Sequence, residues 1–217
     1  MIEAVIFDFD GTLMNTNKIV MESWQHTYRE LTGSEGDREE ILKTFGEPLE
    51  ESMKAAFPQV PSEVSVGVYR DFHRDYFLDM IELFPGVEDM LERVRSLGYK
   101  TALATSRLRK TTYQGLDKYD AEKFFDVIVT VEDVDRHKPD PESILVTAGR
   151  LGVSPENALM VGDTRFDILC GRNAGSPTVL VGWSEAMSAD SEEIPEDEKP
   201  DYIIERPADL ITLLEKL

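Results

Sequence analysis

Residues 5–13 read VIFDFDGTL, so an apolar strand runs directly into two carboxylates, Asp8 and Asp10, followed by Gly11. Side chains two residues apart on a strand point to the same side, and these carboxylates can converge where the strand leaves the sheet. Their mutual repulsion favours a bound divalent cation or a shared proton. Gly11 lets the backbone approach a ligand closely. The stretch therefore predicts a chemical site rather than an Asp-rich turn whose side chains only bond the backbone.

Three later segments add polar groups that suit phosphoryl chemistry. Two of these segments are apolar runs, one followed by hydroxyl groups and the other by carboxylates. The third is a loop in which a lysine precedes a proline. These groups are Thr105 and Ser106, Lys138 before Pro139, and Asp163 with Asp167 four positions on. Ligands of an open parallel α/β sheet bind outside the carboxyl ends of its strands. The order of the segments predicts one site assembled from distant pieces.

The pattern of elements predicts an α/β fold, a doubly wound parallel sheet with an inserted helical cap domain. Strands are expected at 2–9, 100–105, 126–131, 158–162, 178–182 and 201–204, with helices near 87–97, 109–118, 140–151, 164–174 and 207–217. Four helices fill the interval after the first strand, and residues 184–200 are expected to form an acidic, turn-rich, solvated loop that is not part of a site. We expect a catalytic core domain of residues 1–14 and 85–217 and a cap domain of residues 15–84.

The longest cap helix is expected over 62–83, because apolar residues recur there at a helical spacing of four positions. These residues are Val64, Val68, Phe72, Tyr76 and Met80. A cap inserted after the catalytic loop can close over the site and recognise the part of the substrate beyond its phosphate. Gly46 and Glu47, in the turn between two cap helices, and His26 are candidate substrate contacts.

Composition excludes several classes of partner. The 217 residues are 41% apolar and carry a net charge of −20, so nucleic acid and anionic membranes would be repelled. Cys170 is the single cysteine, which excludes an intrachain disulfide, and we expect it to be a buried thiol. The sequence shows no signal peptide and no apolar run near 18 residues. A cytoplasmic protein, monomeric or homodimeric, is the expectation.

Four ordered motifs resemble those of the haloacid dehalogenase (HAD) superfamily of phosphohydrolases, in the branch that includes phosphoglycolate phosphatase. The motifs are Asp8-x-Asp10-Gly11-Thr12, Thr105-Ser106, Lys138-Pro139 and Gly162-Asp163-x-x-x-Asp167. Residues 15–17, 23–27 and 125–134 are similar to the bacterial inorganic pyrophosphatase of that superfamily. The resemblance covers essentially the whole chain and implies a HAD-like, Rossmannoid core.

The resemblance also implies a role for each motif. Asp8 would attack phosphorus and form an aspartyl-phosphate. Asp10 would protonate the leaving oxygen and then take a proton from the hydrolytic water. Lys138 would offset the charge of the transferring group, beside the Thr105 hydroxyl, the Ser106 amide and Gly11.

A magnesium ion is implied by the same resemblance. Asp8, Asp163 and the backbone carbonyl of Asp10 would hold Mg²⁺, which prefers oxygen ligands. Asp167 would orient Lys138 or a metal-bound water. The four carboxylates would repel a dianionic phosphate unless Lys138 and the metal reversed the local charge.

Several activities fit these motifs. A small phosphomonoester such as phosphoglycolate is the first expectation, and inorganic pyrophosphate follows closely. Asp10 argues against dehalogenation, which needs no proton donor. Sugar-phosphate mutases commonly carry His where Val20 stands and an acidic pair where Gly162-Asp163 stands. A phospho-acceptor regulatory module is the alternative outside enzymes, but such modules are about half as long and lack the helical insertion.

Two further departures concern the cap. Phosphonate hydrolases of the superfamily use a cap lysine for an imine, and we expect Lys18, Lys43 and Lys54 to be surface residues instead. Many relatives have Asp where this chain has Asn15. If Asn15 caps a helix, stability would hardly differ from that with Asp, but an electrostatic role of this hinge position in cap closure becomes doubtful.

Overall fold

The computed structural model describes residues 1–184, 195 and 198–217. The chain forms two compact units, one of Met1–Asn15 with Glu82–Leu217 and the other of Thr16–Ile81. We refer to them as the sheet unit and the helical unit. Nearly all of the acidic loop expected over 184–200 lies outside the described residues.

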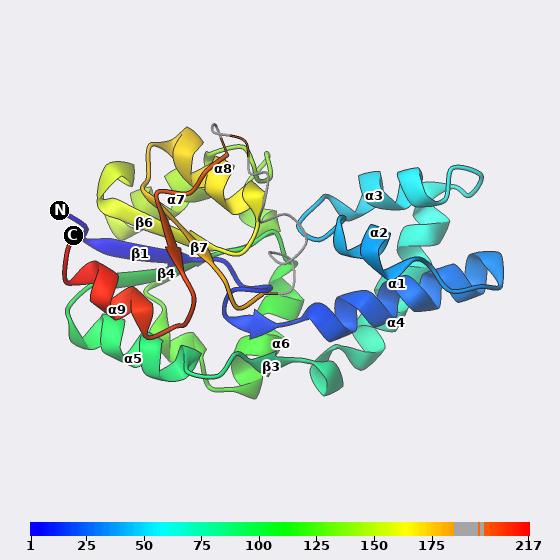
Figure 1. Ribbon diagram of the computed structural model, residues 1–217, viewed down its shortest axis with the longest axis horizontal. Coiled ribbons are helices and arrows are strands. Elements are labelled where there is room, and N and C mark those ends of the chain that lie inside the picture. Colours follow the sequence, from blue (N-terminus) through cyan, green and yellow to red (C-terminus); the bar gives the residue numbers. More distant parts are fainter. Residues whose placement is uncertain (185–194, 196–197) are drawn as a thin grey trace. The chain divides into compact units, whose positions relative to one another are not determined.

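Six parallel strands form the main sheet in the order β5-β4-β1-β6-β7-β8 (Figure 1). They are β1 Ala4–Phe7, β4 Lys100–Ala104, β5 Val127–Val129, β6 Ala158–Gly162, β7 Thr178–Val181 and β8 Tyr202–Ile204. From β1 the chain builds outward to β4 and β5, then crosses to β6, β7 and β8, so strand order reverses at β1. The predicted doubly wound parallel sheet is confirmed, with most strands a few residues shorter at their ends than expected.

The register brings three strand ends level with one another. Phe7 pairs with Leu103 of β4 on one side and with Val161 of β6 on the other. The residues that follow these positions therefore emerge together at the carboxyl edge of the sheet. In an open α/β sheet this edge, at the reversal of strand order, is where ligands bind.

Helices cover both faces of the sheet. They are α5 Val87–Ser96, α6 Arg109–Lys118, α7 Glu142–Leu151, α8 Arg165–Ala174 and α9 Asp209–Leu214, with 3₁₀ turns at Glu122–Phe124, Val131–Asp133 and Pro155–Asn157. Helices α7 and α8 lie on one face, and α5 and α9 on the other (Figure 1). The closing helix is shorter than the expected 207–217.

The alternation of side chains along β1 determines which helices lie beside the Asp8 side chain. Ala4 and Ile6 are fully buried in one cluster with Ile144 of α7 and Cys170 of α8. Asp8 lies two residues after Ile6, so its side chain points to the same face of the sheet. This is the face that α7 and α8 cover. The Cys170 thiol is buried, as predicted, and donates to the Asp140 carbonyl at 3.0 Å.

A short antiparallel pair, which the sequence pattern did not predict, ends the expected helix 62–83 early. Strand β2, Met14–Asn15, pairs with β3, Glu82–Leu83. Helix α4 stops at Met80, and Ile81 is already extended, with φ −107° and ψ 148°. Both segments that connect the two units therefore belong to one small ladder.

The helical unit consists of α1 Asn17–Thr32, α2 Arg38–Leu42, α3 Leu49–Ala56 and α4 Ser62–Met80. Helix α1 ends at Gly33, whose φ of +74° suits glycine. Its Trp24 packs with Phe57 and Tyr69, at ring-centroid distances of 6.4 and 6.0 Å. These rings belong to the buried cluster that holds the helices together.

The apolar residues four positions apart in α4 do not all lie on its buried face. Val64 and Tyr76 are 49% and 45% exposed, whereas Val66, Tyr69 and Phe77 are buried. Successive residues turn by about 100° around a helix, so each four-residue step advances about 40° beyond a full turn. Five residues at this spacing spread over nearly half the circumference and cannot share one buried stripe.

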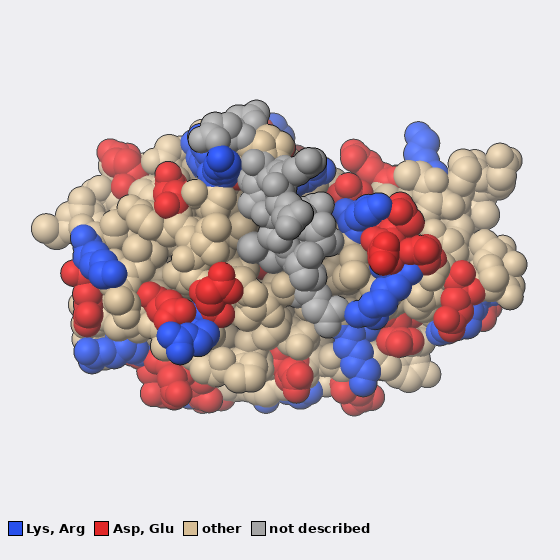
Figure 2. Space-filling model, viewed as in Figure 1, with Lys and Arg blue, Asp and Glu red and all other residues tan. Residues whose placement is uncertain are grey.

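Charged side chains of both signs are interspersed over the visible face of the molecule (Figure 2). On this face the 43 acidic and 23 basic residues of the chain therefore contribute charges of both signs rather than a patch of one sign. Among the residues that the structure describes, no helix combines the length and apolar character needed to cross a membrane.

Candidate active site

Asp8 lies immediately after β1, at the reversal of strand order. Its backbone N–H still donates to the Val161 carbonyl of β6 at 2.9 Å, which fixes the residue at the sheet edge. The Asp8 side chain is 11% exposed. Burial raises the pKa of Asp8, Lys138 opposes that rise, and nearby Asp167 and Asp10 add to it, so the pKa reaches about 7.

Lys138 binds Asp8 from the loop that precedes α7. Its Nζ donates to Asp8 Oδ1 at 2.7 Å, to Asp167 Oδ1 at 2.7 Å and to the Ala104 carbonyl at 2.8 Å. An ammonium group has three donors, and these three acceptors match them. Burial disfavours the charged ammonium, but Asp167 and Asp8 outweigh it and the pKa of Lys138 is raised. The Lys138–Pro139 peptide is cis.

Asp167 connects this lysine to α8. Its Oδ1 accepts from Lys138, while Oδ2 accepts from the Thr164 backbone N–H at 3.1 Å and hydroxyl at 2.7 Å. Thr164 and Asp167 thus form a capping box at the start of α8. One carboxylate therefore both caps the helix and positions Lys138 against Asp8, and the capping box itself holds that carboxylate in place.

A buried carboxylate cluster suits a divalent cation. Asp8, Asp163 and Asp167 each offer an oxygen within 4.8 Å of the others. Asp163 Oδ2 accepts from the Ser184 hydroxyl at 2.7 Å, but its buried Oδ1 has no hydrogen-bond partner. Burial, followed by repulsion from Asp167 and Asp8, raises the pKa of Asp163 well above its usual range. An unsatisfied buried oxygen among hard anionic ligands fits Mg²⁺.

Gly11 is needed where the loop after β1 passes Asp163. Its φ is +73°, a left-handed conformation that favours glycine. A Cβ built on Gly11 would lie 1.8 Å from Asp163 Oδ2 and 2.9 Å from Ser184 Oγ. The absence of a side chain thus permits the Asp163–Ser184 contact.

Thr105 and Ser106 follow β4, next to Asp8 in the sheet. The Thr105 N–H donates to the Val129 carbonyl at 3.0 Å, and its side chain is buried. Its hydroxyl accepts from the Arg107 N–H at 3.1 Å. Ser106 is exposed, so Thr105 is the hydroxyl that the fold holds in a fixed position.

Arg107 was missed by the sequence analysis. Its Nη1 lies 2.7 Å from Asp10 Oδ1, and the side chains of Arg107 and Asp10 are 8% and 34% exposed. The guanidinium carbon also lies 5.7 Å from the centre of the Phe9 ring, within cation–π range. A basic residue two positions after a strand-end Thr was the only signal in the sequence.

Ser184 corrects a second expectation. The sequence pattern assigned it to a solvated loop that takes no part in a site, yet it is 5% exposed and bonds Asp163. The preceding Trp183 Nε1 donates to the Thr12 carbonyl at 3.0 Å. The segment after β7 therefore packs against the loop after β1, a contact that no local pattern announces.

The candidate substrate contacts near and within the helical unit have local roles. Asn15 lies in β2, so the expectation of a helix cap there is wrong; the residue before α1 is Thr16, which makes no side-chain cap hydrogen bond. His26 stacks on Phe72 with ring centroids 4.6 Å apart.

The turn before α3 holds the other two candidates. Gly46 has φ +84°, which favours glycine. Glu47 Oε2 accepts from the Ser52 hydroxyl at 2.8 Å, which ties the turn to the helix that follows. Of the cap lysines, Lys43 is exposed and pairs with Glu40 at 2.7 Å, as expected of a surface residue.

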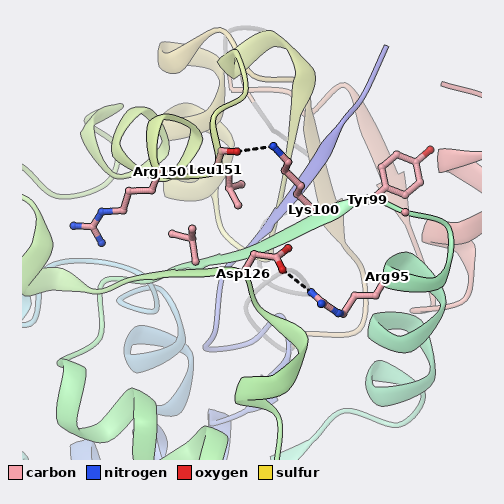
Figure 3. Close-up of a pocket in the computed structure, with 8 residues that line it drawn as sticks. Arg95, Tyr99, Lys100, Asp126, Arg150 and Leu151 are labelled. Carbon is pink, nitrogen blue, oxygen red and sulfur yellow. Dashed lines mark hydrogen bonds and ion pairs between the residues drawn. The ribbon is translucent and has the colours of Figure 1, made fainter.

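A hollow of about 390 Å³ lies at the opposite edge of the sheet from Asp8 (Figure 3). The residues that line it lie near the start of β4 and β5. The charged side chains among them bind other atoms of the protein. Arg95 pairs with Asp126 at 3.1 Å, Lys100 donates to the Leu151 carbonyl at 2.7 Å, and Arg150 pairs with Asp133 at 3.0 Å. These contacts join helices to strand ends and indicate a structural role.

Comparison with known proteins agrees with this geometry. A family model described as haloacid dehalogenase-like hydrolase matches residues 5–181. A Bacillus mycoides protein named pyrophosphatase PpaX is 33% identical over 216 residues, which span 100% of this chain and 98% of that protein. A Clostridium perfringens protein that carries the PpaX name provisionally is 36% identical over 217 residues, 100% of this chain and 99% of its own length.

Solved structures show the same fold. A haloacid dehalogenase-like hydrolase of Streptococcus pneumoniae superposes with a TM-score of 0.86 and 26% identity, covering 98% of each chain. A Lactobacillus plantarum protein provisionally designated phosphoglycolate phosphatase gives a TM-score of 0.84 and 25% identity, covering 98% of this chain and 99% of that one.

Proposed function

This chain belongs to the haloacid dehalogenase-like hydrolase family, and from that premise we propose that it is a Mg²⁺-dependent phosphohydrolase that cleaves inorganic pyrophosphate through an aspartyl-phosphate on Asp8. The ion pair between Lys138 and Asp8, held by Asp167, carries the proposal. It holds a buried carboxylate in a fixed position beside a cation at the carboxyl edge of the sheet, as nucleophilic catalysis at phosphorus requires.

The reaction has two displacement steps. In the first, an Asp8 oxygen bonds to phosphorus while the bond to the leaving oxygen breaks, and Asp10 gives its proton to that oxygen. In the second, Asp10 takes a proton from water, the water oxygen bonds to the same phosphorus, and Asp8 leaves as a carboxylate. The balance is one pyrophosphate and one water consumed and two phosphates formed.

The remaining residues bind and orient the phosphoryl group. The buried Thr105 hydroxyl and the Ser106 amide would donate to its oxygens, and Lys138 would neutralise part of its charge. Asp8, Asp163 and the backbone carbonyl of Asp10 would hold Mg²⁺, with the unpartnered Asp163 Oδ1 as one ligand. Bound there, Mg²⁺ would act as a Lewis acid that offsets negative charge on the phosphoryl oxygens.

Pyrophosphate is the substrate that the names of relatives at 33% and 36% identity favour. The phosphoglycolate-like ester, which the sequence analysis put first, is the second candidate because of the designation of the Lactobacillus plantarum structure. We also propose that the helical unit, residues 16–81, is the cap that selects among such small substrates. The proposed substrates are small molecules, and the net charge of −20 would repel nucleic acid and anionic membranes. We therefore expect neither of them as a partner.

Steady-state phosphate release from pyrophosphate and phosphoglycolate tests the proposal. With Mg²⁺ we expect turnover of pyrophosphate at a kcat/KM above that of phosphoglycolate, and with excess chelator we expect turnover to be lost. The variant Asp8→Asn should lose activity, because an amide cannot form the covalent intermediate. An Asp8→Asn enzyme that retained a tenth of wild-type turnover, or hydrolysis unchanged by chelator, would contradict the scheme.

A further inference from the structure

The two-step scheme leaves the buried cation beside Asp10 without a role. Arg107 Nη1 contacts Asp10 Oδ1 at 2.7 Å, and its side chain is only 8% exposed. Asp10 must move protons to and from oxygens that it contacts directly. A residue that served only to hold Asp10 would not need a full positive charge at the place where the leaving group departs.

The guanidinium is held in place from several sides. The Arg107 backbone N–H donates to Thr105 Oγ1 at 3.1 Å, and its carbonyl accepts from the Val131 N–H at 3.2 Å. The side chain lies against Phe9, which is fully buried. Because both backbone groups are bonded and the side chain is packed, the charge is fixed before any ligand arrives, which limits the entropy lost on binding.

We propose that Arg107 binds the leaving group and selects substrates whose leaving group carries its own negative charge next to the scissile oxygen. The inference rests on the proposed function, in which Asp10 protonates that oxygen. A general acid lies about 2.6–3.2 Å from the atom it protonates, and Arg107 lies 2.7 Å from the same carboxylate. An anionic group attached to the leaving oxygen is therefore within reach of the guanidinium.

Inorganic pyrophosphate fits this requirement best. Its leaving group is a second phosphate, whose charged oxygens are bonded to the same phosphorus as the scissile oxygen. Arginine presents a planar fork of N–H donors that matches phosphate geometry in a way that the ammonium of lysine does not. In phosphoglycolate the carboxylate is separated from the scissile oxygen by a methylene group. We expect it to rank second, and esters with uncharged leaving groups to rank last.

The test compares two substrates in matched variants. Pyrophosphate has an anionic leaving group, whereas ethyl phosphate needs the same proton from Asp10 but releases uncharged ethanol. The kcat/KM ratio for pyrophosphate over ethyl phosphate should fall by about 100-fold in Arg107→Met, the order of effect seen when one fixed donor to a transition-state anion is removed. Arg107→Lys, which keeps the charge without the fork, should recover part of the ratio.

Arg109→Met is the matched control. It removes the same charge two residues along the chain, but Arg109 is 54% exposed and pairs with Asp133 at 3.0 Å. The kcat/KM ratio of this variant for pyrophosphate over ethyl phosphate should equal that of the wild type. Circular dichroism of each variant, and its fluorescence in a Trp24→Phe background that leaves Trp183 as the tryptophan, report whether the sheet unit is folded.

Each outcome decides the inference. A fall of tenfold or more in the ratio for folded Arg107→Met supports leaving-group recognition. A smaller fall, with both substrates slowed together, means that Arg107 only positions Asp10 and overturns the inference while leaving the proposed function standing. A wild-type enzyme that hydrolysed neither substrate would overturn both.

Discussion

Replacing Lys138 with Met should destabilise the sheet unit more than any single loss of a neutral hydrogen bond. The Lys138, Asp8 and Asp167 side chains are 6%, 11% and 3% exposed, and each carboxylate lies 2.7 Å from the ammonium. Removing one partner of a buried ion pair leaves uncompensated charge and costs about 3–5 kcal/mol. For a domain of about 150–250 residues, that corresponds to a fall in Tm of roughly 6–20 °C.

The pH dependence of this loss has a definite sign. The pKa of Lys138 is raised above the value of free lysine, so its contribution to stability is complete at pH 7 and is lost only above about pH 10.4. After replacement, the two remaining carboxylates can relieve their repulsion by taking up protons. Proton uptake is harder at pH 8 than at pH 6, and the destabilisation should therefore be larger at pH 8.

Urea unfolding in the presence of chelator measures the effect. A Trp24→Phe background leaves Trp183, in the sheet unit, as the tryptophan that reports unfolding. The matched control is Lys100→Met, because Lys100 donates to the neutral Leu151 carbonyl at 2.7 Å and its loss should cost about 1 kcal/mol. Added Mg²⁺ should stabilise Lys138→Met more than the wild type, since its site is one charge more negative.

A Lys138→Met variant no less stable than Lys100→Met at pH 8 would refute this reasoning. The same conclusion would follow if its loss of stability were equal at pH 6 and pH 8. Either result would mean that the carboxylates around Lys138 are solvated or protonated in the folded protein.

Three further predictions concern the surrounding residues. Gly11→Ala should lower the free energy of unfolding in urea by about 1–2 kcal/mol from its left-handed φ alone. It should also weaken Mg²⁺ binding, measured by calorimetry, because the new Cβ would lie 1.8 Å from Asp163 Oδ2. Unchanged Mg²⁺ binding would contradict this close approach. Ser184→Ala should raise the Kd for Mg²⁺ about tenfold, the usual order for a residue that orients a metal ligand, and a Kd within twofold of wild type would exclude that role. Partial burial raises the pKa of Asp133, but hydrogen bonds from Thr130 outweigh it and bring the pKa to about 2. Asp133→Asn should therefore lower the free energy of unfolding by about 1–2 kcal/mol at pH 7, after allowance for solvent screening. This loss of stability should shrink as pH falls from about 4 toward 2. A loss that did not depend on pH in urea titrations would show that the charge of Asp133 is not involved.

The strand-end residues of the site could be predicted from the sequence. Asp8 and Asp163 each follow an apolar run, and parallel strands deliver their carboxyl ends to one edge. Asp167 could be placed because it falls three positions after Thr164 at the start of a helix, where a capping box is expected. In each case a local pattern fixes the backbone, and the backbone fixes the direction of the side chain.

Arg107 and Ser184 could not be placed in this way. Their contacts with Asp10 and Asp163 span 97 and 21 positions, and both residues lie in loops without periodicity. A loop side chain has no face fixed by spacing, so its partner depends on how two loops pack. The buried face of α4 could not be predicted from the sequence for a related reason. A four-residue spacing of apolar residues drifts around the helix, and the packing of α1 against α4 decides which of them are buried.

Arg107, one of the two residues that sequence reasoning missed, adds a second cation to the site. Asp8, Asp163 and Asp167 face the single cation Lys138, which leaves two negative charges that one divalent ion would neutralise. Asp10 and Arg107 lie 2.7 Å apart in a separate ion pair. In the proposed scheme, the transferred phosphoryl group of pyrophosphate would contact Lys138 and the metal, and its second phosphate would contact Arg107. Loss of Arg107 would then leave the chemistry at the first phosphate in place and remove the preference for an anionic leaving group.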